Sequence, residues 1–167
     1  METALVSYFA SAVESLFAEA VPLKLEHGGT SKLNETELKL KIDDLRLMES
    51  NLSAVMGRLI AIQRDMSFQD MQSISRAFDD YLGFKPEWNS EVNNIILALA
   101  CRHAIVHSGG VVTNKTCKQV SIAVPRALKI DLANGQRIQF TTEEVTIVSG
   151  SMTSYLNSLI RGVDKAL

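Results

Sequence analysis

The chain has 167 residues, of which 46% are hydrophobic and 22% are charged, and its formal net charge at pH 7 is −2. This length suits one domain with a substantial core, so we expect a single domain over residues 1–167. The slightly negative charge excludes a protein that attracts nucleic acid through a general positive field, whereas a local basic rim could still bind RNA.

The cysteines and the N-terminus indicate the compartment. Cys101 and Cys117 have no paired spacing that would suggest a disulfide framework or a zinc site, and two free thiols fit a reducing cytoplasm. The N-terminal METALVSYF lacks the basic start and uninterrupted apolar core of a signal peptide. No stretch approaches the ~18 apolar residues of a membrane span. We therefore expect a cytoplasmic protein with no membrane segment.

Helical periodicity dominates the first half of the chain. Apolar residues at helical spacing predict a first helix over residues 3–20, which Pro22 and the following Gly-Gly pair should end. A second, long helix is predicted over residues 34–66. A third, shorter helix is expected to begin near Ser67 and to end at Gly83.

Residues 92–106, VNNIILALACRHAIV, contain neither Gly nor Pro and predict a fourth helix. Asn89 or Ser90 can cap its start, and Ser108-Gly109-Gly110 is a stop signal. Its apolar residues point in nearly every direction, which indicates burial on several sides. The helix is therefore either central in a bundle or shared between the core and a dimer interface.

The sequence changes character after this helix. Residues 120–124 and 128–140 alternate like short strands, and Asn134-Gly135 stand where a primed two-residue hairpin turn would need them. Thr141 and Glu144 have the spacing of a capping box that opens a final helix. We therefore expect a mainly α fold, an up-and-down helical bundle with a small β-hairpin before the last helix.

Arg102, His103 and His107 are the candidate catalytic residues, since an arginine can bind phosphate beside a histidine that titrates near neutrality. His103 and His107 are four residues apart and share a helix face, whereas Arg102 and His107 are separated by roughly 140° around an ideal helix. Arg102 could reach His107 through the length of its side chain, through a helix end loosened by Gly109 and Gly110, or from a second copy across a two-fold axis.

Structural interpretations of these residues stay open. An arginine or histidine near a helix C-terminus commonly caps the last carbonyls. Asp79 and Asp80 are neighbours whose side chains diverge on a helix, and no other ligand set converges in the sequence, so we expect no metal and no cofactor. Ser108 activated by His107 is a further alternative, disfavoured because adjacent side chains rarely align for that hydrogen bond. His27, in a Gly-Gly-Thr loop, is expected at the surface.

The stretch RHAIVHSGGVV, residues 102–112, resembles the signature of HEPN domains, a family of small helical bundles. That signature is an arginine, a polar residue, three variable residues and a histidine, which are here Arg102, His103, residues 104–106 and His107. The continuation into Gly109 and Gly110, followed by a hairpin pattern and a helix, is most similar to the RiboL-PSP-HEPN branch.

The resemblance implies a metal-independent endoribonuclease whose active site forms where two protomers of a homodimer bring their motifs together. Arg102 would bind the scissile phosphate, and His107 would take the proton of the ribose 2′-OH. A histidine of the partner protomer, or His103, would protonate the leaving oxygen, unless His103 positions the phosphate. RNA would be cut to a 2′,3′-cyclic phosphate and DNA would survive.

The family also implies a biological setting, in which the protein is a toxin of a defence or toxin-antitoxin system with an antitoxin or a neighbouring defence protein as partner. The alternative is a non-catalytic helical module that dimerises or docks a partner through the same surface.

Overall fold

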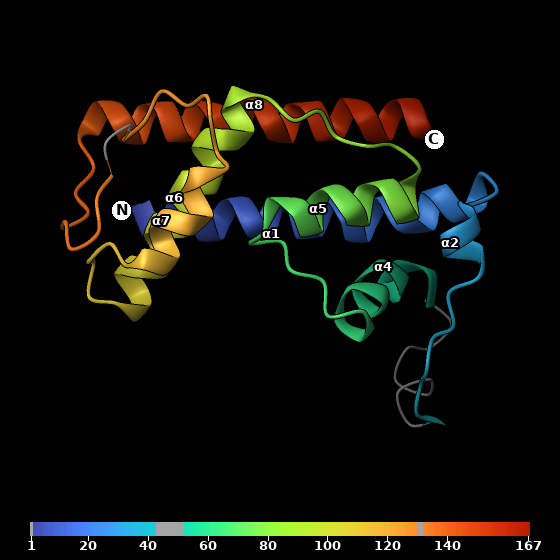
Figure 1. Cartoon of the computed structure of the whole chain (residues 1–167). Helices are drawn as coiled ribbons and strands as arrows, with labels where there is room; N and C mark the ends of the chain where they lie inside the picture. Colours follow the sequence, from blue (N-terminus) through green and yellow to red (C-terminus); the bar gives the residue numbers. More distant parts are fainter. Residues whose placement is uncertain (1, 43–51, 130–131) are drawn as a thin grey trace. The chain divides into compact units, whose positions relative to one another are not determined.

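The computed structural model describes residues 2–42, 52–129 and 132–167 (Figure 1). These residues are mainly helical, which confirms the mainly α character of the expected fold. They form two compact units. Unit 1 contains the described residues of Met1–Ala10, Gln69–Met71 and Glu87–Ser158, and unit 2 those of Ser11–Phe68, Gln72–Pro86 and Leu159–Leu167. The long helices α1 (Glu2–Glu26) and α8 (Thr142–Ala166) each contribute to both units.

Helix α1 contains Pro22 in its interior, so the prediction that Pro22 ends the helix is wrong. A proline lacks the N–H that would bond the carbonyl four residues earlier, here that of Ala18. Helix α4 (Leu52–Gln63) approaches α1 closely at this carbonyl. Any side chain at Gly57 would clash with the backbone of Ala18. The missing side chain at position 57 permits a close helix contact at the point where α1 lacks one of its own hydrogen bonds.

The predicted helix over residues 34–66 is wrong in its first part. A short helix, α2 (Ser31–Asn34), ends where the predicted helix should begin, and residues 36–41 are not helical. The hydroxyl oxygen of Thr30 caps α2 by accepting from the amide of Leu33, and the hydroxyl donates to the carbonyl of Asp80 at 2.6 Å. Residues 43–51 lie outside the described residues, and α4 confirms the helix over its own range.

The third predicted helix is confirmed, with a later start. It consists of α5 (Met71–Ala77) and a π-helical continuation, η1 (Phe78–Leu82), which Gly83 ends with a φ of +79°. A φ in this range is readily adopted only by glycine. The sequence pattern therefore located the end of this helix correctly.

Aromatic rings pack together in unit 2. The ring of Phe17, which is fully buried, lies 5.5 Å from Phe68, 5.9 Å from Phe78 and 6.0 Å from Tyr81, measured between ring centroids. Ring pairs at these separations each stabilise the fold by about 0.5–1.5 kcal/mol beyond the burial of their area. This cluster connects α1 to η1 and to Phe68, which precedes α5.

Helix α6 (Ser90–His107) is the predicted fourth helix. Asn89 caps it, as expected, by accepting from the amides of Glu91 and Val92. Its buried residues fall on several faces: Val92, Asn93, Asn94, Ile95, Leu97, Ala98, Ala100, Cys101 and Ala104. The helix is thus central within unit 1, and one chain alone covers much of the apolar surface that suggested a dimer interface.

The predicted β-hairpin is wrong, because the described residues of 120–140 form no strand. Helix α7 (Asn114–Ser121) takes up the start of the first expected strand. The turn itself exists, since the amide of Gln136 donates to the carbonyl of Ala133, but only Gly135 has a positive φ, at +83°. A primed type I′ turn needs a positive φ at both central residues, so this turn is of a different type.

The segment around this turn pairs with the residues that follow α6. The amide of Val112 donates to the carbonyl of Gln136 at 2.9 Å, and an isolated antiparallel bridge joins Val111 to Arg137. The alternation in the sequence thus reflects a loop whose partner is the segment after α6, at Val111 and Val112.

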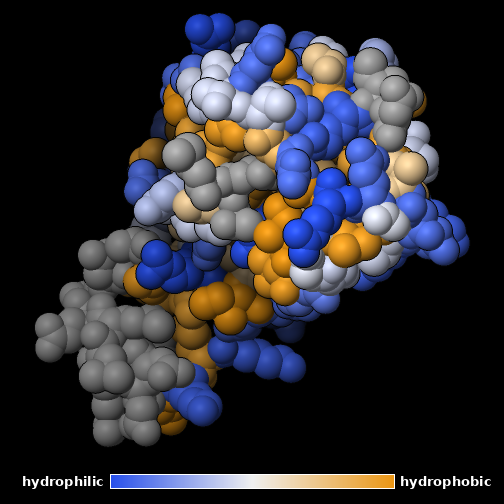
Figure 2. Space-filling view, turned by 90° about the vertical axis from the view of Figure 1, so that its left-hand side faces the viewer, coloured by the Kyte–Doolittle hydropathy of each residue, from blue (hydrophilic) through white to orange (hydrophobic). Residues whose placement is uncertain are grey.

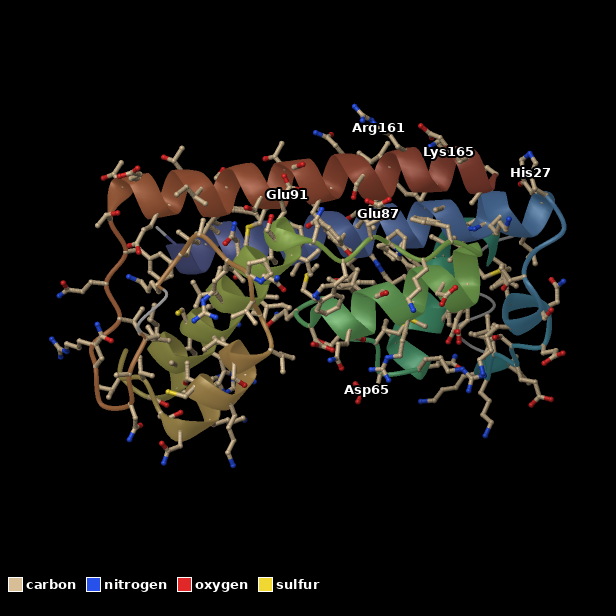
Figure 3. The ribbon with its side chains drawn as sticks, turned by 45° about the horizontal axis from the view of Figure 1, so that its top comes forward. His27, Asp65, Glu87, Glu91, Arg161 and Lys165 are labelled. Carbon is tan, nitrogen blue, oxygen red and sulfur yellow. The ribbon has the colours of Figure 1, made fainter. Side chains whose placement is uncertain are left out.

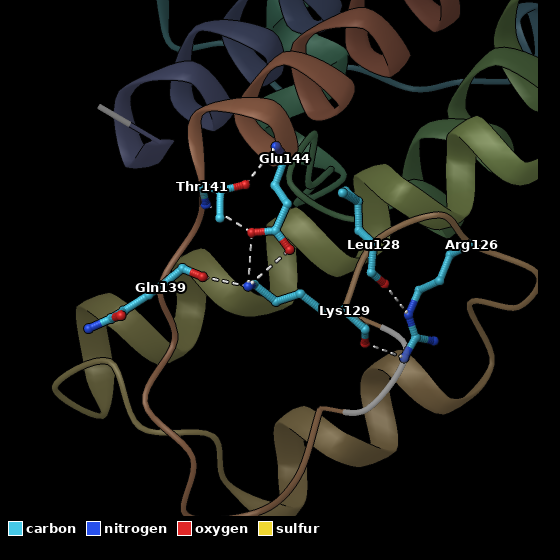
Figure 4. Close-up of polar contacts among 6 residues, drawn as sticks. All are labelled: Arg126, Leu128, Lys129, Gln139, Thr141 and Glu144. Carbon is cyan, nitrogen blue, oxygen red and sulfur yellow. Dashed lines mark hydrogen bonds and ion pairs between the residues drawn. The ribbon is translucent and has the colours of Figure 1, made fainter.

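Two basic residues hold the connection between α7 and α8 (Figure 4). The guanidinium of Arg126 donates to four backbone carbonyls, those of Val120, Ala123, Leu128 and Lys129. The ammonium of Lys129 donates to the carbonyl of Gln139. It also donates to both carboxylate oxygens of Glu144, each at 3.1 Å. The side chain of Arg126 therefore stabilises the loop that follows α7.

The capping box that opens α8 is confirmed. The amide of Glu144 donates to the hydroxyl oxygen of Thr141 at 3.2 Å, and the amide of Thr141 donates to the Glu144 carboxylate at 2.9 Å. The Glu144 carboxylate thus accepts from the amide of Thr141 in the helix cap and forms an ion pair with Lys129.

Helix α1 is long and apolar enough over Ala4–Glu26 to cross a membrane, judged by length and composition alone, and 39% of its most apolar stretch is buried within the protein. The core helix of a soluble protein and a signal sequence can have the same properties. The expectation that no stretch approaches a membrane span does not account for this helix, because Glu14 and Glu19 interrupt its apolar run.

Candidate functional site

The candidate site lies at the C-terminal end of α6, in unit 1. The amides of Ser108 and Gly110 both donate to the carbonyl of Ala104, at 2.8 and 3.1 Å, which closes the last turn of the helix. Gly109 and Gly110 have φ values of +60° and +77°, which side chains rarely tolerate. The two glycines therefore end α6 directly after His107, as the sequence predicted.

His103 and His107 form a pair of rings. Their centroids are 4.5 Å apart, and the ring planes are inclined at 46°. His103 is half-buried and His107 is exposed, so the pair is open to solvent on one side. The structure thus confirms that the two histidines share a helix face.

Arg102 points to a different partner. Its Nη1 donates to the side-chain oxygen of Gln69 at 2.9 Å, and its Nε is buried without any hydrogen-bond partner. Among the described residues, no hydrogen bond joins Arg102 to His107, so the reach of the arginine does not bring these two groups together within one protomer. Sequence reasoning missed Gln69, whose contact depends on the tertiary packing of residues 33 positions apart.

The electrostatic surroundings of His103 favour its neutral form. Partial burial lowers the pKa of His103 below its ordinary value of 6.5, and the charges of His107, Lys115 and Arg102 lower it further. Lys115 and Arg102 are cations, so positive charge is concentrated here on a chain whose net charge is −2. A neutral imidazole can accept a proton, which suits His103 to the role of a base.

Lys115 is a site residue that the sequence analysis missed. It stands in the first turn of α7, which packs against α6. Residues 120–124 are predicted as a strand, and the polar residues before them carry no sign that Lys115 returns towards His103. A capping box between Thr113 and Thr116, visible in the sequence, could have located this helix.

The other candidate residues lie apart from the site. His27 is exposed, as expected, at the end of α1 in unit 2, and its Nδ1 lies 2.8 Å from the carbonyl oxygen of Leu23 (Figure 3). Cys101 is buried, Cys117 is half-buried, and neither is in a disulfide. Within residues 2–42, 52–129 and 132–167, no three His, Cys, Asp or Glu side chains are grouped to hold a metal ion.

The arrangement is chemically suited to an anion. It offers a guanidinium with further donors, a pair of imidazoles, and an ammonium on the neighbouring helix. No protein-family model matches this chain, and no curated protein or solved structure matches it either.

Proposed function

We propose that the protein is a metal-independent endoribonuclease in which Arg102, His103 and His107 act on RNA. The observation that carries the proposal is the pair of imidazole rings 4.5 Å apart beside an arginine, at the end of a glycine-terminated helix. The resemblance of residues 102–112 to the HEPN signature gives further support. Two histidines and a cation are sufficient for RNA cleavage without a metal or a cofactor.

The proposed reaction is an attack of the ribose 2′-oxygen on the adjacent phosphorus. A neutral imidazole takes the 2′-OH proton as the O2′–P bond forms, and a protonated imidazole gives a proton to the 5′-oxygen as the P–O5′ bond breaks. The lowered pKa of His103 suits it to be the base, which leaves His107 as the acid. Arg102 stabilises the charge that develops on the phosphate oxygens. The products are a 2′,3′-cyclic phosphate and a 5′-hydroxyl.

The proposal includes a homodimer in which the two motifs face one another across a cleft. Four apolar side chains in α6 or in the segments before and after α7 are exposed: Val106 by 54%, Val111 by 36%, Ile122 by 60% and Val124 by 62%. On the side of the molecule seen in Figure 2, apolar atoms are exposed among hydrophilic ones. Exposed apolar patches commonly mark association surfaces. Light scattering at micromolar concentration should give a dimer, and a monomer throughout that range would remove the shared cleft.

The test is cleavage of a synthetic RNA and of a DNA of the same sequence. RNA should be cut in the presence of EDTA, the cut ends should be cyclic phosphates, and DNA should stay intact. His103→Ala and His107→Ala should each reduce the rate by about 10²–10⁴-fold, the usual contribution of an acid or a base. Arg102→Lys should restore only part of the activity lost in Arg102→Ala, because an ammonium lacks the planar fork.

His27→Ala is the matched control, because this exposed histidine lies in the other unit. It should cleave at the unmodified rate. Circular dichroism of every variant separates loss of chemistry from loss of fold. Full activity in a folded His107→Ala protein would overturn the mechanism, and cleavage that stops on adding EDTA would require a metal site instead.

The exposed apolar side chains also favour a second candidate, a non-catalytic module that dimerises or binds a partner protein, such as an antitoxin or a neighbouring defence protein. Both candidates assume a cytoplasmic protein. Growth distinguishes them: an active ribonuclease toxin should slow the growth of cells that express it, and His107→Ala should relieve this effect. A binding module should leave growth unchanged in both forms.

A further inference from the structure

The first turn of α7 carries Lys115, whose charge acts on His103. Helix α7 lies beside α6 in Figure 1, the two helices pack together, and the chain between them reverses at Gly109 and Gly110. Lys115 is exposed on α7, whereas His103 is half-buried on α6. One protomer thus presents an ammonium and two imidazoles from two neighbouring helices.

We propose that Lys115 and the ring pair of His103 and His107 form one phosphate-binding site within a single protomer, in which Lys115 holds a phosphate group of an RNA strand. The part of this inference that concerns RNA rests on the proposed function. The binding of phosphate itself does not, and it can be measured on a protein that cleaves nothing.

Lys115 supplies a mobile contact that the other groups near the ring pair do not supply. Arg102 already donates one Nη1 hydrogen bond to Gln69. The amide of Thr116, at the start of α7, already donates to the hydroxyl oxygen of Thr113, so the capping box satisfies this helix end internally. Lys115 has a flexible, exposed ammonium with three donors, which can follow a phosphate into place.

The charges around His103 support the inference. The groups whose charges act on this imidazole are His107 and Arg102 from α6 and Lys115 from α7, and all of them lower its pKa. Bringing like charges together is unfavourable without a counter-charge, so an anion bound among them relieves the repulsion. Bound phosphate should consequently raise the pKa of His103, and His103 should take up a proton as phosphate binds.

The test is an NMR titration of the full-length protein with inorganic phosphate at low ionic strength, following the imidazole resonances of His103 and His107. Both should shift in a saturable way, while those of His27 should not. Lys115→Met should weaken phosphate binding about tenfold, the effect of losing one charge-assisted contact. Lys115→Arg should restore most of the affinity.

Lys118→Met is the matched control, since Lys118 is an exposed lysine on the same helix whose charge is not among those acting on His103. It should change the affinity less than twofold. The inference fails if His103 does not respond to phosphate, or if Lys115→Met and Lys118→Met behave alike. The pKa of His103 in the free protein gives a second readout, because it should rise in Lys115→Met and stay unchanged in Lys118→Met.

Cleavage assays separate this inference from the proposed function. If phosphate binds but RNA is not cut, the ribonuclease proposal fails and the phosphate site stands. If RNA is cut, Lys115→Met should raise the KM for RNA more than it lowers kcat. An unchanged KM, with phosphate binding weakened, would mean that the site takes a free phosphate ion and would overturn its assignment to the RNA strand.

Discussion

The aromatic cluster of unit 2 and the loop region of unit 1 are held together by different forces. Around Phe17, rings contact one another at centroid distances of 5.5–6.0 Å. Between α6, α7 and α8, the connecting segments are held by directed hydrogen bonds: Asn94 accepts from Ala127, and Arg126 and Lys129 donate. Apolar burial is non-directional and leaves a periodic trace in the sequence, whereas a hydrogen bond depends on one particular pair of groups. The candidate site belongs to the second region.

The largest effect is expected in the aromatic cluster. Phe17→Ala removes a fully buried ring with three aromatic neighbours, so it should lower the free energy of unfolding by about 3–5 kcal/mol. Phe17→Leu should lose less, because it keeps much of the buried volume. Chemical denaturation measures both variants. A loss below ~1 kcal/mol for Phe17→Ala would mean that the cluster is not a rigid part of the core.

In unit 1, replacing the buried side-chain amide of Asn94 should lower stability. The amide nitrogen of Asn94 donates to the hydroxyl of Ser151, and its oxygen accepts from the amide of Ala127. Asn94→Ala should lower stability by about 1–3 kcal/mol, because Ser151 loses its buried partner. In a double-mutant cycle, Ser151→Ala should then add less than it does alone. Strict additivity would show that the two side chains do not interact in solution.

Substitutions at Gly135 should lower stability by a smaller amount, through backbone strain in the turn. A side chain at this position meets nothing within 4 Å, so only the φ of +83° opposes it. Gly135→Val should lower stability by about 1–2 kcal/mol, whereas Gly135→Asn should lower it by less, because asparagine tolerates this region. Melting temperatures compare the two variants. Equal melting temperatures for the valine variant and the unmodified protein would place the strained turn elsewhere.

The smallest effect is expected at Glu144 and depends on pH. Burial raises the pKa of Glu144, but the hydrogen bonds from Thr141 and the ammonium of Lys129 outweigh it and hold the pKa below 4.5. A carboxyl group with a lowered pKa stabilises the fold above its unfolded pKa, and this contribution is lost as the pH falls through the folded pKa. Glu144→Gln should therefore be less stable by about 0.5–1 kcal/mol at neutral pH. The difference should shrink below pH 4.5, and a constant difference across the acid range would contradict this assignment.

The contrast between the two regions explains what could be predicted from the sequence. The helix caps at Asn89 and Thr141 and the glycine stop after His107 depend on neighbouring residues, so the sequence located them. The contact between Arg102 and Gln69 depends on packing between distant segments, and local patterns carry no trace of it. The alternation over residues 128–140 was misleading because an extended loop alternates like a strand, and its partner, Val112, stands before α7 rather than after it.

The buried Nε of Arg102 has an evolutionary consequence. A buried donor without a partner destabilises a fold by about 1–3 kcal/mol, so Arg102→Met should melt at a higher temperature than the unmodified protein. A collection of variants selected only for heat resistance should therefore lose this arginine early, and with it the proposed activity. Because Arg102 lowers the stability of the fold, selection in the cell would keep it only if the activity outweighs this loss.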